Sequence, residues 1–139
     1  VNKQSGHVTL TEICGLPNGI VANPPVVDMK RQIVVGFDSG NGVISGFDYD
    51  EDSVTLRWSH EQNHACHMLL IPETGQVITA DYRPELGCEQ VVVLDITTGK
   101  EVARVSTTSP IQSAVFPAIG PQGDIYWCSM TTITRISVR

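Results

Sequence analysis

The chain has 139 residues, 41% of them hydrophobic, and a formal net charge of −6 with a sequence pI of about 5.0. This length allows one domain with a buried core, and this composition argues against intrinsic disorder. An acidic chain without a basic cluster lacks the positive surface that phosphate binding requires, and no apolar run approaches the ~20 residues of a membrane helix. We therefore expect neither a nucleic-acid nor a membrane partner, and the compartment is left open.

The first part of the chain predicts a series of short strands. Residues 8–14 alternate between apolar and polar side chains, which favours a strand. A loop over residues 15–23 then leads to a short apolar strand at residues 26–28. Short β-branched and aromatic runs between Gly, Asn and Asp clusters are typical of an antiparallel meander. They predict strands at residues 33–38, 43–48 and 53–58.

The rest of the chain continues in the same way. Pro and Gly occur too often for a long helix, and apolar residues recur with period two or in continuous runs. We therefore expect no amphipathic helix of useful length. Further strands are predicted at residues 67–71, 76–81, 90–95, 100–105, 114–116, 124–129 and 133–138.

An internal repeat of 47 residues relates these strands. Phe47 is matched by Leu94, and Trp58 is matched by Val105 at the same spacing. Units of four strands with a period of ~40–50 residues are typical of β-propeller blades. The predicted fold is all-β, with three four-stranded antiparallel blades that form half or a fragment of a β-propeller in one domain. The blades are expected at residues 24–58, 67–105 and 114–138, the last completed by residues 8–14.

The repeat contains recognisable segments. In the first unit they are Pro25-Val26-Val27-Asp28, Ile33-Val34-Val35-Gly36, Gly46-Phe47-Asp48 and Leu56-Arg57-Trp58. Related segments recur at Leu94-Asp95, Thr98-Gly99-Lys100 and residues 116–126. Together they resemble the quinoprotein-type (PQQ-like) propeller repeat, although the closing Trp occurs once, at Trp58. The resemblance implies a scaffold and does not imply that a quinone binds, so we expect no cofactor.

Three blades cannot close a ring, because propellers need roughly four to eight. An open wedge would expose apolar faces and an unpaired edge. The expected partner is therefore a second copy in a two-fold homodimer, or other blades of a larger propeller. Cys14 and Cys128 would share a blade if residues 8–14 complete the third, which makes them the disulfide candidates. The alternative is that the cysteines are free thiols.

The densest set of chemically active side chains is the stretch from His60 to His67, with three histidines and Cys66. Imidazole and thiolate groups bind zinc, copper or nickel, and histidine is the usual acid-base residue near neutral pH. The spacing matches no named motif, so we assign no metal ligands. The plain alternative is a polar loop that enters the next strand.

Topology favours a ligand site at one face. In a propeller this loop, the loop over residues 15–23 and the loop over residues 106–112 each join an outer strand to the next innermost strand, and all feed the central channel. We expect a binding or assembly module with a small-molecule ligand at that face. The alternative is an enzyme with a channel histidine, metal-assisted or similar to bacterial aryl sulfotransferases. The predicted ligand-binding residues are Asn18, Asn23, His60, Asn63, His64, Ser109 and Gln112.

Most aspartates stand at strand ends, where a carboxylate commonly caps a turn. We therefore predict turn-capping roles for Asp28, Asp38, Asp48, Asp81 and Asp95. The large apolar side chains are predicted to pack between sheets. They are Phe47, Trp58, Leu94, Phe116 and Trp127.

Overall fold

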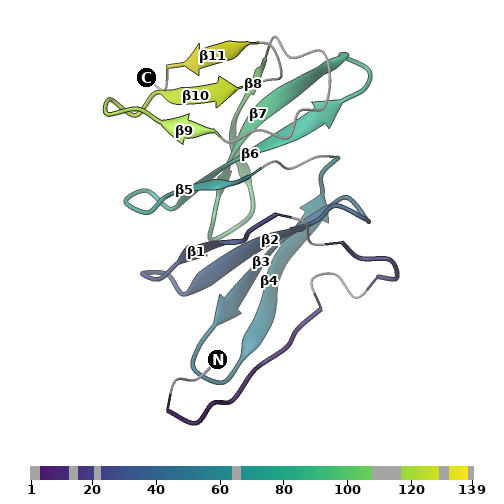
Figure 1. Ribbon diagram of the computed structural model, residues 1–139, viewed down its shortest axis with the longest axis vertical. Helices are drawn as coiled ribbons and strands as arrows, with labels where there is room; N and C mark the ends of the chain where they lie inside the picture. The colour runs from purple at the N-terminus through teal and green to yellow at the C-terminus, as the bar shows by residue number, and fades with distance from the viewer. Residues whose placement is uncertain are drawn as a thin grey trace.

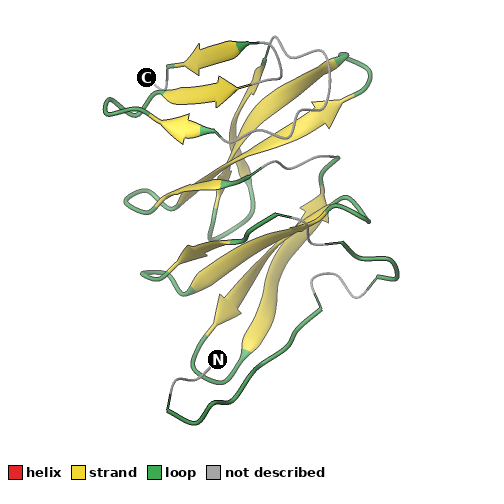
Figure 2. Ribbon diagram, in the orientation of Figure 1, coloured by secondary structure: helices red, strands yellow, loops and turns green. Residues whose placement is uncertain are grey.

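The protein is all-β and consists of three antiparallel sheets stacked face to face (Figures 1 and 2). The structure, a computed structural model, describes residues 4–12, 16–20, 23–63, 67–107, 117–128 and 132–137. These residues include no helix, and therefore none that is long and apolar enough to cross a membrane. The predicted all-β class is confirmed.

The first and second sheets are four-stranded meanders in chain order. The first contains β1 (Val26–Asp28), β2 (Ile33–Asp38), β3 (Val43–Tyr49) and β4 (Val54–Glu61). The second contains β5 (Leu69–Ile71), β6 (Gln76–Arg83), β7 (Cys88–Asp95) and β8 (Glu101–Ser106). The sequence predicted all eight strands, but it placed residues 82–89 in a loop. The β6–β7 hairpin instead continues to Arg83 and Cys88, which face each other.

The third sheet has three strands in the described part of the chain: β9 (Ala118–Ile119), β10 (Ile125–Cys128) and β11 (Ile133–Ile136). The predicted strand at residues 114–116, with Phe116, lies outside the described residues.

The N-terminal segment does not complete this third sheet. Residues 4–12 contain no strand, and the hydroxyl of Thr9 donates a hydrogen bond to the carbonyl of Asp52 in the β3–β4 turn. Figure 1 shows this segment beside the first sheet, at the opposite end of the stack from β11. Residues 8–12 therefore do not pair beside residues 133–137 as predicted, and residues 13, 14 and 138 of that prediction lie outside the described residues. A period-two pattern predicts a strand, but it does not specify which sheet edge lies within reach.

The 47-residue repeat is visible in the strand pairing, because the same register shift occurs in the first and second sheets. The β3–β4 register shifts between Gly46 and Phe47, and the β7–β8 register shifts between Val93 and Leu94. Trp58 is paired with Gly46, whereas Ala103 is paired with Val93. The structural counterpart of Trp58 is therefore Ala103 and not Val105 as predicted, because the chain from Leu94 to its partner Glu101 is two residues shorter than the chain from Phe47 to its partner Leu56.

Two apolar layers hold the stack together. Between the first and second sheets, the buried layer contains Ile33, Val35, Phe37, Ile44, Met68, Val77, Val92, Leu94 and Ile96. Between the second and third sheets, it contains Ile78, Ala80, Val91, Ile125 and Trp127. Alternate residues of β6 contribute to opposite layers, as period-two geometry requires of a strand that is covered on both faces.

Trp58 joins the first two sheets. Its ring lies over Gly46, and its indole N–H donates a hydrogen bond of 2.8 Å to the carbonyl of Ile96 in the second sheet. Trp58 is half-buried, and Leu94 and Trp127 are buried between sheets as predicted. Phe47 is also buried, but it belongs to neither layer between the sheets. The glycine at position 46 follows from this contact, because a Cβ there would overlap the indole ring.

We therefore expect Gly46→Ala to lower the free energy of unfolding by about 1–3 kcal/mol, as overpacking does. Equilibrium urea unfolding followed by circular dichroism measures this loss. The matched control is the same change in a Trp58→Leu background, where the smaller side chain leaves room for the added methyl. An equal loss in both backgrounds would show that the contact with Trp58 is not the cause.

Two of the four cysteines lie in the described part of the chain. Cys88 and Cys128 are free thiols there. Cys14 and Cys66 lie outside the described residues. Since Cys128 is unpaired, the predicted bond between Cys14 and Cys128 is absent from this structure.

Candidate functional site

Buried aspartates occupy the same position in the first two sheets. Asp38 ends β2, and Asp81 is the corresponding residue of β6; both are almost completely buried. Each carboxylate accepts a backbone N–H from the loop before its sheet, 18 residues earlier in both cases. Ile20 donates to Asp38 at 2.8 Å, and Asn63 donates to Asp81 at 3.0 Å. In both sheets the carboxylate thus fastens the entering loop to the end of the second strand.

Asp38 also has local partners. Its carboxylate accepts the backbone N–H groups of Gly40 and Asn41 and the side-chain amide of Asn41. This is the turn-capping role that the sequence predicted. Asp38 therefore acts as a structural residue of the β2–β3 turn.

Asp81 has different partners, because two arginines reach its buried carboxylate. Arg83 Nε and Arg104 Nη1 each lie 2.8 Å from Asp81 Oδ2. A buried carboxylate needs such compensation, since burial of an unpaired charge is costly. The sequence prediction of a turn cap is wrong for Asp81, and the second sheet carries a charged cluster where the first has a simple turn.

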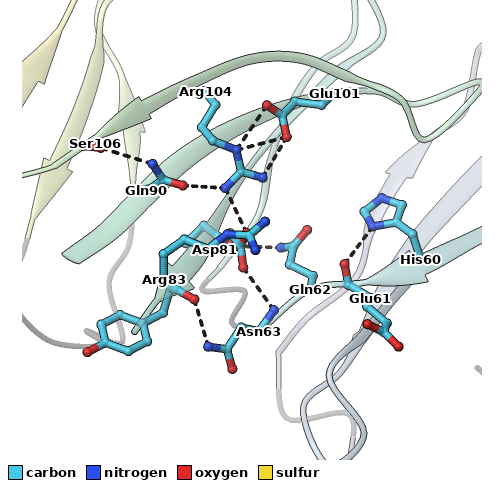
Figure 3. Close-up of polar contacts among 12 residues, drawn as sticks. His60, Glu61, Gln62, Asn63, Asp81, Arg83, Gln90, Glu101, Arg104 and Ser106 are labelled. Carbon is cyan, nitrogen blue, oxygen red and sulfur yellow. Dashed lines mark hydrogen bonds and ion pairs between the residues drawn. The ribbon is translucent and has the colours of Figure 1, made fainter. Parts of the chain in front are cut away.

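The cluster continues across the second sheet (Figure 3). Arg104 Nη1 also donates to Gln90 Oε1 at 2.7 Å, and Gln90 Nε2 donates to the Ser106 hydroxyl at 3.1 Å. The Glu101 carboxylate accepts three further bonds from Arg104, at 3.1, 3.0 and 2.7 Å. These bonds with Glu101, and then those with Asp81, raise the pKa of the Arg104 guanidinium above its ordinary value although burial opposes them. Arg104 is therefore a fixed cation held by protein groups.

Two adjoining hollows open beside this cluster, with volumes of about 270 and 320 Å³. Both are bordered by Glu61, Gln62, Asp81 and Arg83, so they form one polar groove between the end of β4 and the second sheet. Arg83 is half-exposed, and its bond to Asp81 uses Nε. The two terminal nitrogens of Arg83 form none of the bonds described above, so they remain the donors best placed for a ligand.

His60 borders the smaller of the two hollows, on the side of the first sheet. Its ring stacks on Trp58, with the ring centroids 5.6 Å apart and an angle of 14° between the planes. Nδ1 lies 3.2 Å from the carbonyl oxygen of Glu61, whereas Nε2 is buried without a partner in the described structure. Nδ1–H can donate to that carbonyl, which leaves Nε2 as a lone-pair nitrogen able to act as a base or acceptor.

The structure brings some of the predicted ligand residues to this groove. His60 and Asn63 line it, and the side chain of Asn63 is held by the carbonyl of Tyr82 at 2.8 Å. Asn18 does not line the groove: its backbone lies against Gly40 in the β2–β3 turn, with a positive φ of 63°. Asn23 precedes β1 and does not line the groove. His64, Ser109 and Gln112 lie outside the described residues.

Sequence reasoning missed the charged side of the groove, which consists of Asp81, Arg83, Glu101 and Arg104, and it missed Gln90, which is bonded to Arg104. Asp81 faces Gln90 in the β6–β7 pair, and Gln90 faces Ser106 in the β7–β8 pair. The spacing of Asp81 and Arg83 by two, in a strand that was predicted to end at residue 81, was the available signal. To use that signal one must know how β6 and β7 pair, and the sequence analysis had assigned residues 82–89 of that hairpin to a loop.

The other aspartates also include both turn caps and a residue that forms an ion pair. Asp28 accepts the backbone N–H groups of Lys30 and Arg31, and Asp95 accepts that of Thr98, so both cap turns as predicted. Asp48 instead pairs with Arg57 at 2.8 Å. Among the residues that the structure describes, no group of three or more His, Cys, Asp and Glu is arranged to hold a metal ion.

No protein-family model matches the chain, and no curated protein matches it. Its fold is similar to that of two solved structures. A candidate 6-phosphogluconolactonase from Bacteroides fragilis aligns with a TM-score of 0.56 and 11% identity, over 81% of this chain and 38% of its own. A second, from Bacteroides uniformis, aligns with a TM-score of 0.56 and 12% identity, over 74% and 31%. The chain thus spans about a third of both structures, and at these identities the likeness concerns the fold alone.

Proposed function

We propose that the chain is part of a β-propeller, half of one or a fragment, that binds a small molecule in the groove beside Asp81. Two kinds of observation support the architecture: the stacked antiparallel meanders and the fold likeness to two longer chains. One observation carries the binding role. At the position where Asp38 caps a turn, Asp81 is buried under two arginines at the edge of a polar groove.

The groove favours a ligand rich in hydroxyl groups. Its border combines donors and acceptors on planar side chains, namely Arg83, Asn63, Asn41 and Glu61. A hydroxyl group both donates and accepts, so several hydroxyls satisfy such a mixed border better than an apolar molecule does. The name of the structural neighbours makes a sugar-acid lactone the first compound to test.

Arg83→Ala tests this role. We expect the variant to bind the ligand at least about tenfold more weakly, since a charge-assisted hydrogen bond contributes roughly 1.5–3 kcal/mol. The measurement is a titration by calorimetry or NMR with gluconolactone, 6-phosphogluconolactone and a panel of monosaccharides. Lys30→Ala removes an exposed cation from the β1–β2 turn and is the control. If none of these compounds binds, or if both variants bind equally well, the proposed site is wrong.

An enzyme with an acid-base histidine is the second candidate, and the position of His60 favours it. His60 lines the same groove and presents a buried Nε2 that has no partner in the described structure. A lactone hydrolase would use such a nitrogen to activate water. The titration samples, assayed for ring opening, distinguish the two candidates. Product formation that His60→Gln abolishes while binding persists supports the enzyme, and binding without turnover supports the binding module.

A further inference from the structure

The three sheets are stacked in chain order, so the two faces of a sheet have different neighbours. We call the face that packs on the preceding sheet the rear face, and the face that packs on the following sheet the forward face. In the second sheet, Leu70 and Val77 are on the rear face and pack against the first sheet. Leu69 and Ile78 are on the forward face and pack against the third. Among the sheets of the described residues, the rear face of the first sheet and the forward face of the third have no such neighbour (Figure 1).

The rear face of the first sheet carries an apolar row across all four strands. Val27 faces Val34, Val34 faces Phe47, and Phe47 faces Leu56, so these four side chains lie side by side. The two ends of the row are open, with Val27 47% exposed and Leu56 58% exposed, whereas Phe47 between them is buried. A hollow of about 250 Å³ lies beside the row, bordered by Thr9 of the N-terminal segment.

The second sheet has a counterpart of this row, and that counterpart packs against the first sheet. Leu70 faces Val77, and Val77 faces Leu94, which are the repeat positions of Val27, Val34 and Phe47. All three counterparts belong to the apolar layer against the first sheet. The row of the first sheet therefore has the composition and register of a surface that the fold uses for packing one sheet on another.

The forward face of the third sheet presents the other half of such a junction. Ala118 faces Tyr126, and Tyr126 faces Arg135. These three residues hold the positions of Val26, Val35 and Gly46 in the first sheet. Ile133 lies on the same face as Arg135, two residues away along β11, and is 74% exposed.

We propose that the occupant of the apolar row is a second copy of this chain, whose third sheet packs with its forward face on the row. Within the described residues, each copy has one rear and one forward face without a neighbouring sheet, and these faces hold the positions that join the sheets within the chain. In a dimer with a two-fold axis, both faces of each copy are covered and the assembly is closed. A head-to-tail contact that does not close would instead form a filament. The assembly is thus a closed homodimer with two such junctions.

The test uses the 139-residue chain in light scattering during size-exclusion chromatography at tens of micromolar. We expect a single species of about twice the chain mass of 15.1 kDa. Leu56→Asp places a charge in the apolar row, and Ile133→Asp places one on the opposite face. We expect each change to weaken dimerisation at least tenfold in sedimentation equilibrium. The matched control is Leu86→Asp, at the tip of the β6–β7 turn, where Leu86 is 57% exposed.

Three outcomes would overturn the proposal. A monomeric wild-type chain would show that no second copy covers the row. A dimer that only Leu56→Asp weakens would be a symmetric contact between two first sheets. A dimer that both variants and the Leu86→Asp control weaken alike would reflect a general effect of charge. Circular dichroism of each variant separates loss of association from loss of folding.

Discussion

Replacing Phe37 by alanine is expected to lower the free energy of unfolding by about 3–5 kcal/mol, the largest effect of any single change considered for this protein. Phe37 is 1% exposed and lies in the apolar layer between the first and second sheets. Its removal costs the transfer free energy of the ring and leaves a cavity, because the facing strands are held by their ladders and cannot close it.

Urea unfolding at a fixed protein concentration measures this loss, since association would otherwise alter the apparent stability. Leu86→Ala is the control, because Leu86 is exposed at a hairpin tip and its truncation should cost less than about 0.5 kcal/mol. A loss below about 1 kcal/mol for Phe37→Ala would contradict the packing of the first two sheets.

The second large effect is expected at the charged cluster. Asp81→Ala removes the carboxylate that two arginines and the backbone N–H of Asn63 share. Breaking a fully buried ion pair costs about 3–5 kcal/mol, but Arg83 and Arg104 remain partly in water. We therefore expect a loss of about 2–3 kcal/mol, with the first sheet's loop less firmly attached to the second.

A double-mutant cycle identifies the cause of that loss. The combination of Asp81→Ala with Arg104→Ala should cost about 1–2 kcal/mol less than the sum of the single changes, because the two residues share one interaction. Glu73→Ala, an exposed carboxylate in the β5–β6 turn, is the control and should combine additively with Arg104→Ala. Additivity of Asp81→Ala and Arg104→Ala within about 0.5 kcal/mol would show that their bond contributes nothing to stability.

The candidate groove depends on both sheets at once. Glu61 and Gln62 follow from the end of β4, whereas Asp81 and Arg83 belong to β6. The side-chain amide of Gln62 donates to the carbonyl of Ala80 at 2.6 Å, which fixes the loop against the second sheet. Variants that loosen this attachment are therefore expected to alter ligand binding and stability together, whereas Arg83→Ala should alter binding with less effect on stability.

The amino-acid sequence by itself determined the strand content of the first two sheets. Period-two alternation and Gly, Asn and Asp turns act within a few residues, so β2 and β3 were located almost to the residue. The same local signals predicted the repeat from Phe47 to Leu94, which reappears as a shared register shift. Two of the predicted ligand residues, His60 and Asn63, border the polar groove, and their binding role stays a prediction.

Only the tertiary structure decided which strands meet and which charges are buried together. Residues 8–12 have the alternation of a strand, yet Thr9 is bonded to Asp52 and no sheet edge receives them. Asp38 and Asp81 have the same place in the repeat, but the arginine of β8 reaches Asp81 because β7 and β8 pair with Gln90 opposite Ser106. Such contacts depend on register and stacking between residues far apart in the chain, and local propensity carries no information about them.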